Sequence, residues 1–334
     1  MKVLACGGAG YIGSHVVYAL LRRGHEVTVY DNLCNGSVEM VARAAGLAGG
    51  DAPLLVGDVR DHDRLAHAMR AGRFDCVIHF AALKAVGESV ADPLRYYDNN
   101  VSGMVSLLRC MQETATQNLV FSSSATVYAA DAAMPVAEDA RLGPVNPYGR
   151  SKWMAELVMQ DLCRAWPAMR ALSLRYFNPA GAHPSGEIGE DPEGIPDNLM
   201  PYIARVAAGR LPEVRVFGDD YPTRDGTGVR DYIHVMDLAE GHVVALEALA
   251  SFAPGWHVFN LGRGEGSSVL EMIERFAAVN GVDVPYRVTA RRDGDLAEVW
   301  ADPARACREL GWQAQRGLDD ICRDAWRWQQ RCGG

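Results

Sequence analysis

Residues 3–13 read Val-Leu-Ala-Cys-Gly-Gly-Ala-Gly-Tyr-Ile-Gly, and this stretch decides the fold class of the chain. Its apolar start predicts a buried strand, and residues 11–23 have the apolar spacing of an amphipathic helix. The glycines therefore lie in the turn between the two elements, where backbone N–H groups and the helix N-terminus can meet a pyrophosphate. We interpret Gly7, Gly10 and Gly13 as the phosphate turn of a dinucleotide-binding fold; the alternative is an ordinary glycine-rich turn.

The same alternation of strand and helix continues outward from this turn. Short β-branched runs alternate with helical periodicity, which predicts an α/β fold with a Rossmann-like, doubly wound parallel sheet. The expected strands are residues 3–6, 26–30, 54–56, 76–80, 119–122 and 172–176. After Asn178 glycine and proline become frequent, so we expect a nucleotide-binding domain over residues 1–178 and a smaller α/β substrate domain over residues 179–334. The strand-like run 256–260 predicts a return to the main sheet.

The overall composition excludes several classes of protein. With 334 residues, 49% of them apolar and 22% charged, the chain is expected to be an ordinary globular protein. A net charge of −9 without a basic cluster argues against nucleic-acid binding. No apolar run is long enough to span a bilayer, and the N-terminus lacks the features of a signal peptide. The eight cysteines have no Cys-x-x-Cys pair or histidine partners, so we expect reduced thiols, a cytoplasmic location and no metal.

Carboxylates follow the second and third predicted strands. Asp31 ends the second strand, where an acidic side chain accepts hydrogen bonds from the adenosine ribose hydroxyls. A carboxylate there repels a 2′-phosphate, so NAD is expected in preference to NADP; a turn residue in Asp31-Asn32 is the alternative. Asp58 occupies the corresponding end of the third strand, where it either bonds the adenine edge or caps a helix that runs from Arg60 onward.

Three further side chains point to proton transfer. Tyr148 and Lys152 follow Pro147 at an expected helix start, and their spacing places both on one helix face. A free tyrosine has a pKa of about 10 and is a poor base until a nearby cation stabilises its phenolate. Lys152 supplies one such charge and an oxidised nicotinamide ring another. Ser124 ends the fifth strand, at the edge where open α/β sheets hold ligands. We interpret these three residues as catalytic; a solvated helix face and a serine-rich turn are the alternatives.

Taken together, these motifs resemble the UDP-glucose 4-epimerase family, in the extended branch of the short-chain dehydrogenase/reductase superfamily. The Gly-x-x-Gly-x-x-Gly spacing is typical of that superfamily. The stretches that resemble the family's own motifs are residues 7–14, 30–35, 80–89, 96–101, 121–128, 175–186, 198–202 and 226–238. This resemblance covers nearly the whole chain. It implies an isomerase that interconverts UDP-galactose and UDP-glucose through a 4-keto intermediate, with transient reduction of bound NAD.

The resemblance also implies roles for individual residues. Tyr148 would take the proton from the sugar 4-hydroxyl, Lys152 would lower the pKa of that phenol and hold the nicotinamide ribose, and Ser124 would share the proton relay. Besides the phosphate turn, Asp31, Asp58, Tyr148 and Lys152, NAD would contact Tyr11, Ile12, Asn32, Asn35, Val59, Phe80, Ala81, Lys84, Asn99 and Phe177. The UDP-hexose would contact Ser124, Tyr148, Asn178, Asn198, Leu199, Phe217, Arg230, Arg292, Asp295 and Val299. Arginines suit the diphosphate because guanidinium groups bind it through two donors at once, and Phe217 would flank the uracil ring.

Two departures from related enzymes bear on specificity. Val299 stands where family members restricted to UDP-glucose and UDP-galactose often carry tyrosine, so we hypothesise that UDP-N-acetylhexosamines are also accepted. A sugar-nucleotide 4,6-dehydratase is a rival, but such enzymes carry an Asp-Glu pair where Ala125 and Thr126 follow Ser124. A UDP-pentose 4-epimerase and a non-enzymatic NAD-binding sensor module are the alternatives that stay open.

Amphipathic helices are expected near residues 96–112 and 148–163, and both carry outward apolar residues. Such residues either pair with a second copy of the chain or cover the sheet alone. The family resemblance implies the first, a homodimer.

Overall fold

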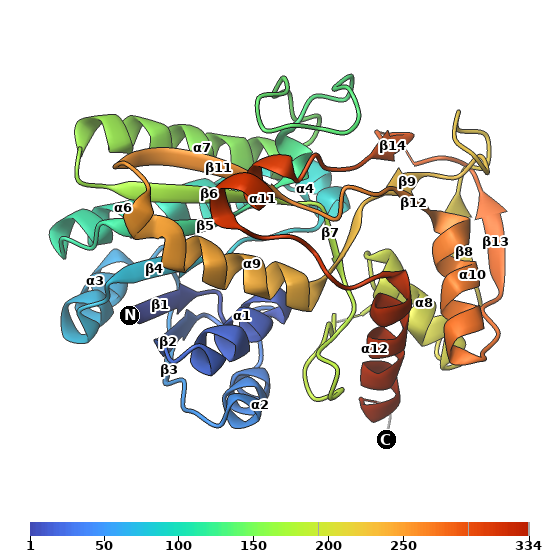
Figure 1. The fold of residues 1–334 in the computed structure, drawn as a ribbon, viewed down its shortest axis with the longest axis horizontal. Coiled ribbons are helices and arrows are strands. Elements are labelled where there is room, and N and C mark those ends of the chain that lie inside the picture. Colours follow the sequence, from blue (N-terminus) through green and yellow to red (C-terminus); the bar gives the residue numbers. More distant parts are fainter. Residues whose placement is uncertain (193, 293, 333–334) are drawn as a thin grey trace.

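The computed structural model describes residues 1–192, 194–292 and 294–332, and its main feature is a seven-stranded parallel sheet (Figure 1). The strands are β1 (Lys2–Cys6), β2 (Glu26–Asp31), β3 (Leu54–Val56), β4 (Cys76–His79), β5 (Asn118–Ser124), β6 (Arg170–Tyr176) and β11 (Gly255–Leu261). Their order is β11-β6-β5-β4-β1-β2-β3, and every neighbouring pair is parallel. This is the order of a doubly wound dinucleotide-binding sheet, so the predicted fold class is confirmed.

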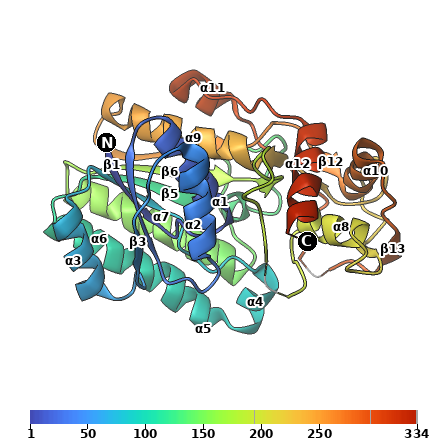
Figure 2. The same ribbon diagram turned by 90° about the horizontal axis from the view of Figure 1, so that it is seen from below.

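Two layers of helices cover the sheet, and the side chains of β1 alternate between them. Val3 and Ala5 pack into the cluster that includes residues of α1 (Tyr11–Arg22), α2 (Val38–Ala48), α9 (Val235–Ala248) and α11 (Ala304–Leu310). Leu4 and Cys6 face the opposite cluster, which includes residues of α3 (His62–Gly72), α6 (Gly103–Glu113) and α7 (Pro147–Ala165). Figure 2 shows α9 beside α1 and α6 beside α3. A strand covered on both faces explains the unbroken apolar run at the start of the chain.

The last strand of the sheet comes from the second half of the chain. β11 pairs in parallel with β6 over its whole length, from Gly255 opposite Arg170 to Leu261 opposite Tyr176, so the predicted return near residues 256–260 is confirmed. Helix α9, which precedes it, packs on α1. The domain border expected at residue 178 stays a prediction; the segment from α9 to β11 packs on α1 and on the main sheet.

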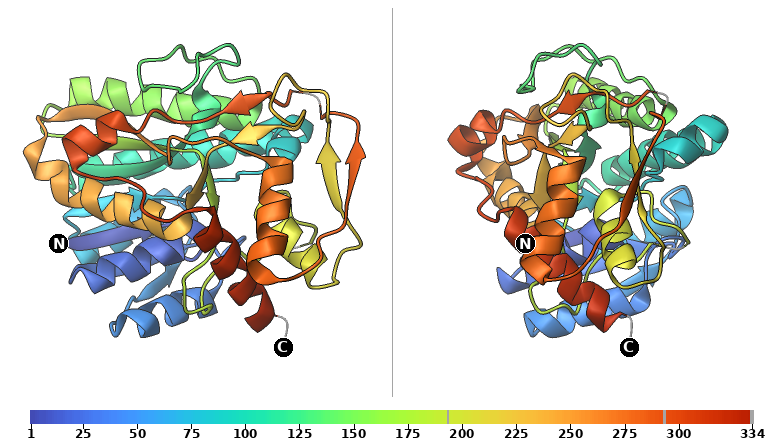
Figure 3. Two further views of the ribbon diagram at one scale, coloured as in Figure 1. Left: turned by 45° about the vertical axis from the view of Figure 1, so that its right-hand side comes forward. Right: turned by 90° about the vertical axis from the view of Figure 1, so that its right-hand side faces the viewer.

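A separate apolar cluster is formed by helices and strands of the second half of the chain. Figure 3 shows these elements beyond the end of the sheet. The cluster is built from residues of α8 (Leu199–Ala207), α10 (Val269–Asn280), α12 (Leu318–Arg331) and β8 (Val214–Phe217). Strand β13 (Tyr286–Thr289) pairs in parallel with β8. Short strands connect this cluster to the sheet: β7 (Asn178–Ala180), β9 (Val229–Arg230), β10 (Tyr232–His234), β12 (Ser267–Ser268) and β14 (Glu298–Val299). Asp231, between β9 and β10, is buried and accepts backbone N–H bonds from Arg263, Gly264 and Ala301 at 2.8, 3.0 and 3.1 Å. One carboxylate therefore fixes three segments of this region.

The helix expected over residues 96–112 is divided in the structure. It consists of α5 (Pro93–Tyr96), the π-helical turn η1 (Tyr97–Ser102) and α6, and is preceded by α4 (Val86–Ala91). The wide turn contains Asn100, whose side chain is buried. Its side-chain oxygen accepts a hydrogen bond from the N–H of Leu83, and its side-chain nitrogen donates to the carbonyl of Leu83 and to the hydroxyl of Ser151. This tertiary anchor explains the irregularity, which apolar spacing cannot reveal. Two 3-10 turns, η2 (Ala125–Val127) and η3 (Leu249–Ser251), complete the description.

Candidate active site

The phosphate turn needs glycine at two of its three positions because of close backbone contacts. Gly7 has a φ of +80°, and a Cβ there would lie 2.3 Å from the backbone nitrogen of Ala81. A Cβ at Gly13 would lie 2.4 Å from the carbonyl oxygen of Gly7. Gly10 is different, because its nearest neighbour, the carbonyl oxygen of Gly7, is 3.7 Å away, and it precedes α1 without a side-chain cap. The first N–H groups of α1 are thus open toward a ligand, as a pyrophosphate requires.

Asp31 lies at the carboxyl end of β2 and supports the phosphate turn. Its carboxylate accepts hydrogen bonds from the backbone N–H groups of Ala9 and Leu33, at 3.0 and 2.8 Å. Burial raises the pKa of Asp31, and the two N–H donors oppose that shift. The bond from Leu33 is the one expected of a turn residue, and the bond from Ala9 ties the carboxylate to the glycine loop. Asp31 is therefore a turn residue, and its contact with the adenosine ribose stays a prediction.

Asp58 does not cap a helix. Helix α3 begins at His62, and its N-cap is Asp61, whose carboxylate accepts the N–H of Arg64 at 3.2 Å. The alternative that Asp58 caps a helix starting at Arg60 is therefore wrong. Instead, Asp58 accepts a hydrogen bond from the side-chain amide of Asn32 at 3.0 Å and forms an ion pair with Arg60. Hydrogen bonds from Arg60 hold the pKa of Asp58 well below its usual value.

The other residues expected to bind NAD surround this edge of the sheet. The backbone N–H groups of Phe80 and Ala81 donate to the carbonyl of Cys6 at 2.7 and 3.0 Å, so these residues lie next to the phosphate turn. The hydroxyl of Tyr11 donates to the carbonyl of Gly181 at 2.7 Å. Val59 and Phe177 are buried, Ile12 is partly buried, Asn99 lies in η1, and Asn35 is exposed beside Cys34.

Ser124, Tyr148 and Lys152 come from β5 and the first two turns of α7. Asn146 caps α7 by accepting the N–H of Gly149 at 2.8 Å, and Pro147 occupies the first turn, so the helix starts where the sequence predicts. The ammonium nitrogen of Lys152 is 5.9 Å from the ring centre of Tyr148. It also donates a hydrogen bond of 2.6 Å to the carbonyl oxygen of Ser122. Tyr148 and Lys152 thus share the helix face that meets the end of β5.

The charges around the phenol differ from the expected set. Burial raises the pKa of Tyr148, while contact with Ser124 and the positive charge of Lys84 lower it. Burial also lowers the pKa of Lys152 to about 7, against the carboxylate of Glu156, which raises it. Lys84, expected only as an NAD contact, therefore adds a positive charge that favours the phenolate. No such role can be read from a lysine in a loop far from Tyr148 in sequence.

Thr126 orients Ser124, and sequence reasoning missed it. The hydroxyl oxygen of Ser124 accepts hydrogen bonds from the backbone N–H of Thr126 at 3.2 Å and from its hydroxyl at 2.9 Å. Since Ser124 accepts both bonds, its own hydroxyl proton is left to donate to the phenol or a ligand. Thr126 stands in the position where a dehydratase would carry a carboxylate.

Four of the residues expected to hold the sugar nucleotide form two pairs, and we call these four residues the sugar side. Arg230 of β9 lies opposite Val299 of β14, and its guanidinium is 3.9 Å from the carboxylate of Asp295. The guanidinium carbon of Arg292 lies 3.7 Å from the ring centre of Phe217, at the end of β8. Asn178 begins β7, and Asn198 precedes Leu199 at the start of α8. These residues come from segments that are distant in sequence, and the pairing of β9 with β14 brings Arg230 next to Val299.

Glu190 connects the two halves of the site and was not found from sequence. Its carboxylate is 2.9 Å from the ammonium of Lys84 and 2.7 Å from the side-chain amide of Asn198. Lys84 is expected to contact NAD, whereas Asn198 is expected to contact the sugar nucleotide. The glycine- and proline-rich segment around Glu190 gave no signal, because its structure depends on tertiary contacts such as the bond from Trp328 to the Glu190 carbonyl.

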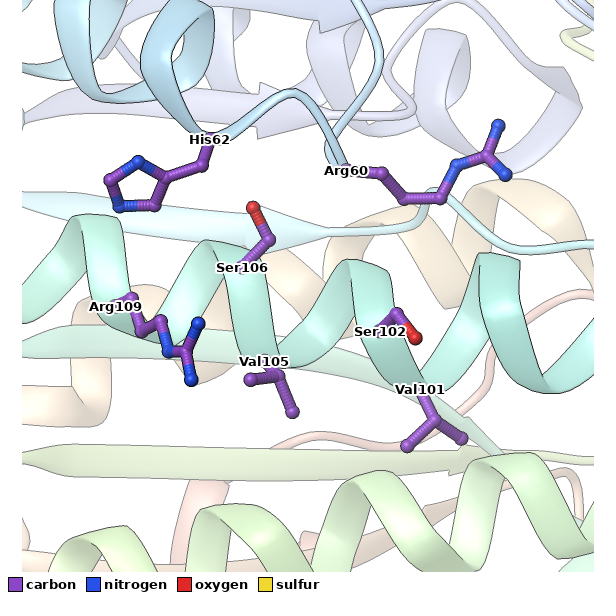
Figure 4. Close-up of a pocket in the computed structure, with 7 residues that line it drawn as sticks. All are labelled: Arg60, His62, Val101, Ser102, Val105, Ser106 and Arg109. Carbon is purple, nitrogen blue, oxygen red and sulfur yellow. The ribbon is translucent and has the colours of Figure 1, made fainter.

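Two surface grooves are lined by other residues. The first, of about 390 Å³, runs between α6 and the start of α3 (Figure 4), and it is lined by Arg60, His62, Val101, Ser102, Val105, Ser106 and Arg109. The second, of about 470 Å³, adjoins it and is lined by Leu94, Tyr97, Asp98, Val101, Ser102 and Met154. None of these lining residues is expected to bind NAD or the sugar nucleotide.

Known proteins resemble the chain over nearly its full length. The sequence pattern of the family described as GDP-mannose 4,6 dehydratase matches residues 4–325. The UDP-glucose 4-epimerase of Bacillus subtilis (strain 168) is 53% identical, over 98% of this chain and 97% of its own. The structure of UDP-glucose 4-epimerase from Stenotrophomonas maltophila, with bound NAD and formylated UDP-arabinopyranose, has a TM-score of 0.97 at 52% identity and covers 99% of this chain and 98% of that one. The Bifidobacterium longum enzyme, in complex with NAD+ and UDP, has a TM-score of 0.96 at 46% identity, with coverage of 99% and 98%.

Proposed function

Since the chain belongs to the family described as GDP-mannose 4,6 dehydratase and, within it, to the UDP-glucose 4-epimerases, we propose that it interconverts UDP-galactose and UDP-glucose with bound NAD. One observation carries this proposal: Ser124, Tyr148 and Lys152 meet at the carboxyl edge of the sheet that also holds the phosphate turn. The experiment is to add UDP-galactose to the purified protein and follow UDP-glucose. Formation of UDP-glucose at equilibrium with UDP-galactose is expected, and no conversion by NAD-loaded protein would contradict the proposal.

The residues around the phosphate turn fit NAD. Gly7 and Gly13 leave room for the close backbone approach, the open N-terminus of α1 would hold the pyrophosphate, and Asp31 would offer a carboxylate to the adenosine ribose. When bound, NAD would supply the hydride acceptor for sugar C4 and, in its reduced form, the hydride donor. We assign Lys84 and Lys152 to the nicotinamide half, near the phenol.

Proton transfer is the task of the protein's own side chains. The phenolate oxygen of Tyr148 removes the proton of the sugar 4-hydroxyl, which pushes electron density toward C4 and favours loss of hydride. Ser124 donates a hydrogen bond to the reacting oxygen, a geometry supported by the two bonds that it accepts from Thr126. The positive charges of Lys152 and Lys84 stabilise the phenolate while the proton is shared. After the keto-sugar turns, Tyr148 gives the proton back.

The sugar side is proposed to anchor the nucleotide diphosphate while the hexose turns. Arg230 and Arg292 would hold the diphosphate, and the ring of Phe217 would flank uracil once Arg292 leaves it. Val299 sits beside Arg230 on the wall of this region. Because its side chain is small, we also propose that UDP-N-acetylhexosamines are accepted, and an assay with UDP-N-acetylglucosamine tests this. No turnover of the acetylated sugar would contradict it.

The rival activities are less well supported. A 4,6-dehydratase needs an acid beside Ser124 to expel the 6-hydroxyl, whereas Thr126 uses its hydroxyl to orient that serine. A UDP-pentose 4-epimerase and an NAD-binding sensor are not favoured, since the relatives are UDP-glucose 4-epimerases. Parallel assays with UDP-xylose and UDP-galactose separate the pentose activity from the hexose activity.

We also propose that the protein is a homodimer. The surface around α5, η1 and α7 carries apolar side chains that the single chain leaves exposed: Leu94 is 77% exposed and Val90 64%, and Met154 and Leu157 are also exposed. The groove lined by Leu94, Tyr97 and Met154 crosses the same surface. A second copy would bury these side chains symmetrically. Sedimentation should give a dimer, and Leu94→Asp should shift it toward the monomer; a monomeric wild-type protein would contradict the proposal.

A cytoplasmic location is proposed from two observations. Within the part of the chain that the structure describes, none of the helices combines the length and apolar character needed to cross a membrane. All eight cysteines are free thiols, which suits a reducing compartment.

A further inference from the structure

A buried ion pair stands directly behind the catalytic residues. Glu156 of α7 and Arg175 of β6 are 0% and 1% exposed, and their groups meet through two contacts, Nε to Oε1 at 3.0 Å and Nη2 to Oε2 at 2.7 Å. Removing two charges from water is costly, and apolar residues of similar size usually give equal or greater stability. Stability alone therefore does not account for this pair.

On one side, the pair reaches the catalytic lysine. Glu156 lies one helical turn beyond Lys152, and the hydroxyl of Ser123 donates to its carboxylate at 2.6 Å. Ser122 precedes Ser123, and its carbonyl oxygen accepts a hydrogen bond from the ammonium of Lys152. Ser124 follows Ser123. At the end of β5, Ser122 therefore contacts Lys152, Ser123 contacts the Glu156–Arg175 pair, and Ser124 contacts the hydroxyl of Tyr148.

Few charged groups face Lys152. Tyr148 and Glu156 lie on its own helix, His79 comes from β4, and β5 presents the ring of Phe121 at 4.9 Å and a backbone carbonyl. Burial lowers the pKa of His79 to about 3, so this imidazole is neutral near pH 7. Among the residues that the structure describes, the carboxylate of Glu156 is therefore the negative charge that acts on the Lys152 ammonium.

On the other side, hydrogen bonds connect the ion pair to the segment that carries Val299. The remaining guanidinium nitrogen of Arg175 donates to the hydroxyl of Tyr128 and to the carbonyl of Glu138, each at 3.0 Å. Tyr128 donates to the side chain of Asn260 at 2.6 Å, and Asn260 donates to the carbonyl of Val136 at 2.8 Å. The N–H of Val136 in turn donates to the carbonyl of Trp300 at 2.9 Å. Trp300 follows Val299, the residue proposed to set sugar specificity.

We propose that Glu156 and Arg175 are positioning residues for the epimerase reaction, holding Lys152 beside the phenol of Tyr148 and fixing the segment 128–138 against the strand that carries Val299. This inference rests on the proposed function. It explains why two charges are retained in the core: the Glu156–Arg175 pair positions both the ammonium of Lys152 and the segment next to Val299.

The test measures the pH dependence of epimerisation in two opposite variants. Glu156→Gln removes the negative charge and leaves the cation of Arg175, so the pKa of Lys152 falls and the basic limb of the profile moves to lower pH by about one unit. Arg175→Met leaves the carboxylate unpaired, so the same limb moves to higher pH. In both variants kcat is expected to fall by about tenfold or more, because the ammonium and phenol lose their alignment.

Two further variants separate positioning from folding. Tyr128→Phe cuts only the link to the sugar wall, so KM should rise by about threefold to tenfold while the basic limb stays in place. Asp237→Asn is the matched control: Asp237 is a buried carboxylate of α9 that pairs with Arg316, and none of its partners belongs to the site. It should lower thermal stability without moving the pH profile.

The outcomes distinguish this inference from the proposed function. If wild-type protein epimerises but Glu156→Gln and Arg175→Met leave the basic limb unmoved, or move it in one direction, the inference is wrong. If the single variants do not fold, the double variant Glu156→Leu with Arg175→Met replaces both charges by apolar groups. A double variant with wild-type kcat and an unchanged limb would also overturn the inference. If wild-type NAD-loaded protein does not epimerise, the proposed function itself has failed.

Discussion

The phosphate turn and the sugar side are held by different kinds of contact. In the phosphate turn, residues 7–13, backbone atoms pack against backbone atoms, so that Gly7 and Gly13 leave no room for a Cβ. The carboxylate of Asp31 also accepts a hydrogen bond from the N–H of Ala9. On the sugar side, side chains hold one another, as Arg292 lies on Phe217 and Arg230 approaches Asp295. A ligand can replace side-chain contacts but not backbone packing. The first region is therefore rigid, and the second can exchange its partners when the substrate arrives.

The largest expected effect comes from breaking the rigid region. Gly7→Ala would place a Cβ 2.3 Å from the backbone of Ala81 at a φ of +80°, so the turn must deform. We expect complete loss of NAD from the purified protein, and with it all activity, measured by cofactor absorbance and turnover.

Gly10→Ala sharpens this comparison. Its Cβ would meet protein no closer than 3.7 Å, so the fold should be unaffected, while a methyl group at the open N-terminus of α1 should weaken NAD binding. Thermal unfolding of the NAD-free proteins separates the two variants. Equal destabilisation by both substitutions would contradict the view that backbone packing holds Gly7.

A smaller effect is expected on the exchangeable side. Arg230→Met removes a cation from the diphosphate site, and a hydrogen bond to a charged group is worth about 1.5 to 3 kcal/mol. KM for UDP-galactose should therefore rise by roughly tenfold to a hundredfold, with little change in kcat and with NAD retained. A fall in kcat at unchanged KM would place Arg230 in the chemical step and contradict the division between the two regions.

The smallest effect concerns selectivity alone. Val299→Tyr should fill the space beside sugar C2 and lower the turnover of UDP-N-acetylglucosamine relative to UDP-glucose by about tenfold or more. Turnover of UDP-glucose itself should change little. The ratio of kcat/KM values for the two sugars is the measurement, and an unchanged ratio would mean that Val299 does not line the sugar.

How far each region can be predicted from sequence follows from the same difference. The phosphate turn, the parallel strands and the returning strand are expressed in short contiguous patterns, and the structure confirms the predicted sheet. The roles of Glu190 and Thr126 were missed, as was the Glu156–Arg175 pair, because each depends on tertiary contacts. Glu190 meets Lys84 across 106 residues. The two charged residues of the pair stand in otherwise ordinary helix and strand patterns, which do not reveal that they meet in the core.

Local competition explains the errors. Asp58 and Asp61 both precede α3, and a capping preference alone cannot choose between them; the structure places Asp61 at the cap and Asp58 with Arg60. The helix expected over residues 96–112 has continuous apolar spacing, yet the buried amide of Asn100 widens it into a π-helical turn. Apolar spacing shows which face is buried but not how polar groups in that face are satisfied.

The proton role of Tyr148 is tested most directly by Tyr148→Phe, because this change removes one hydroxyl and leaves the ring. The variant should still retain NAD and bind UDP with near wild-type affinity, while kcat falls by about a hundredfold to ten-thousandfold. Reduction of the bound nicotinamide on adding UDP-galactose, followed by its near-ultraviolet band, should slow by the same factor. Wild-type turnover in a variant that keeps NAD and UDP binding would contradict the account.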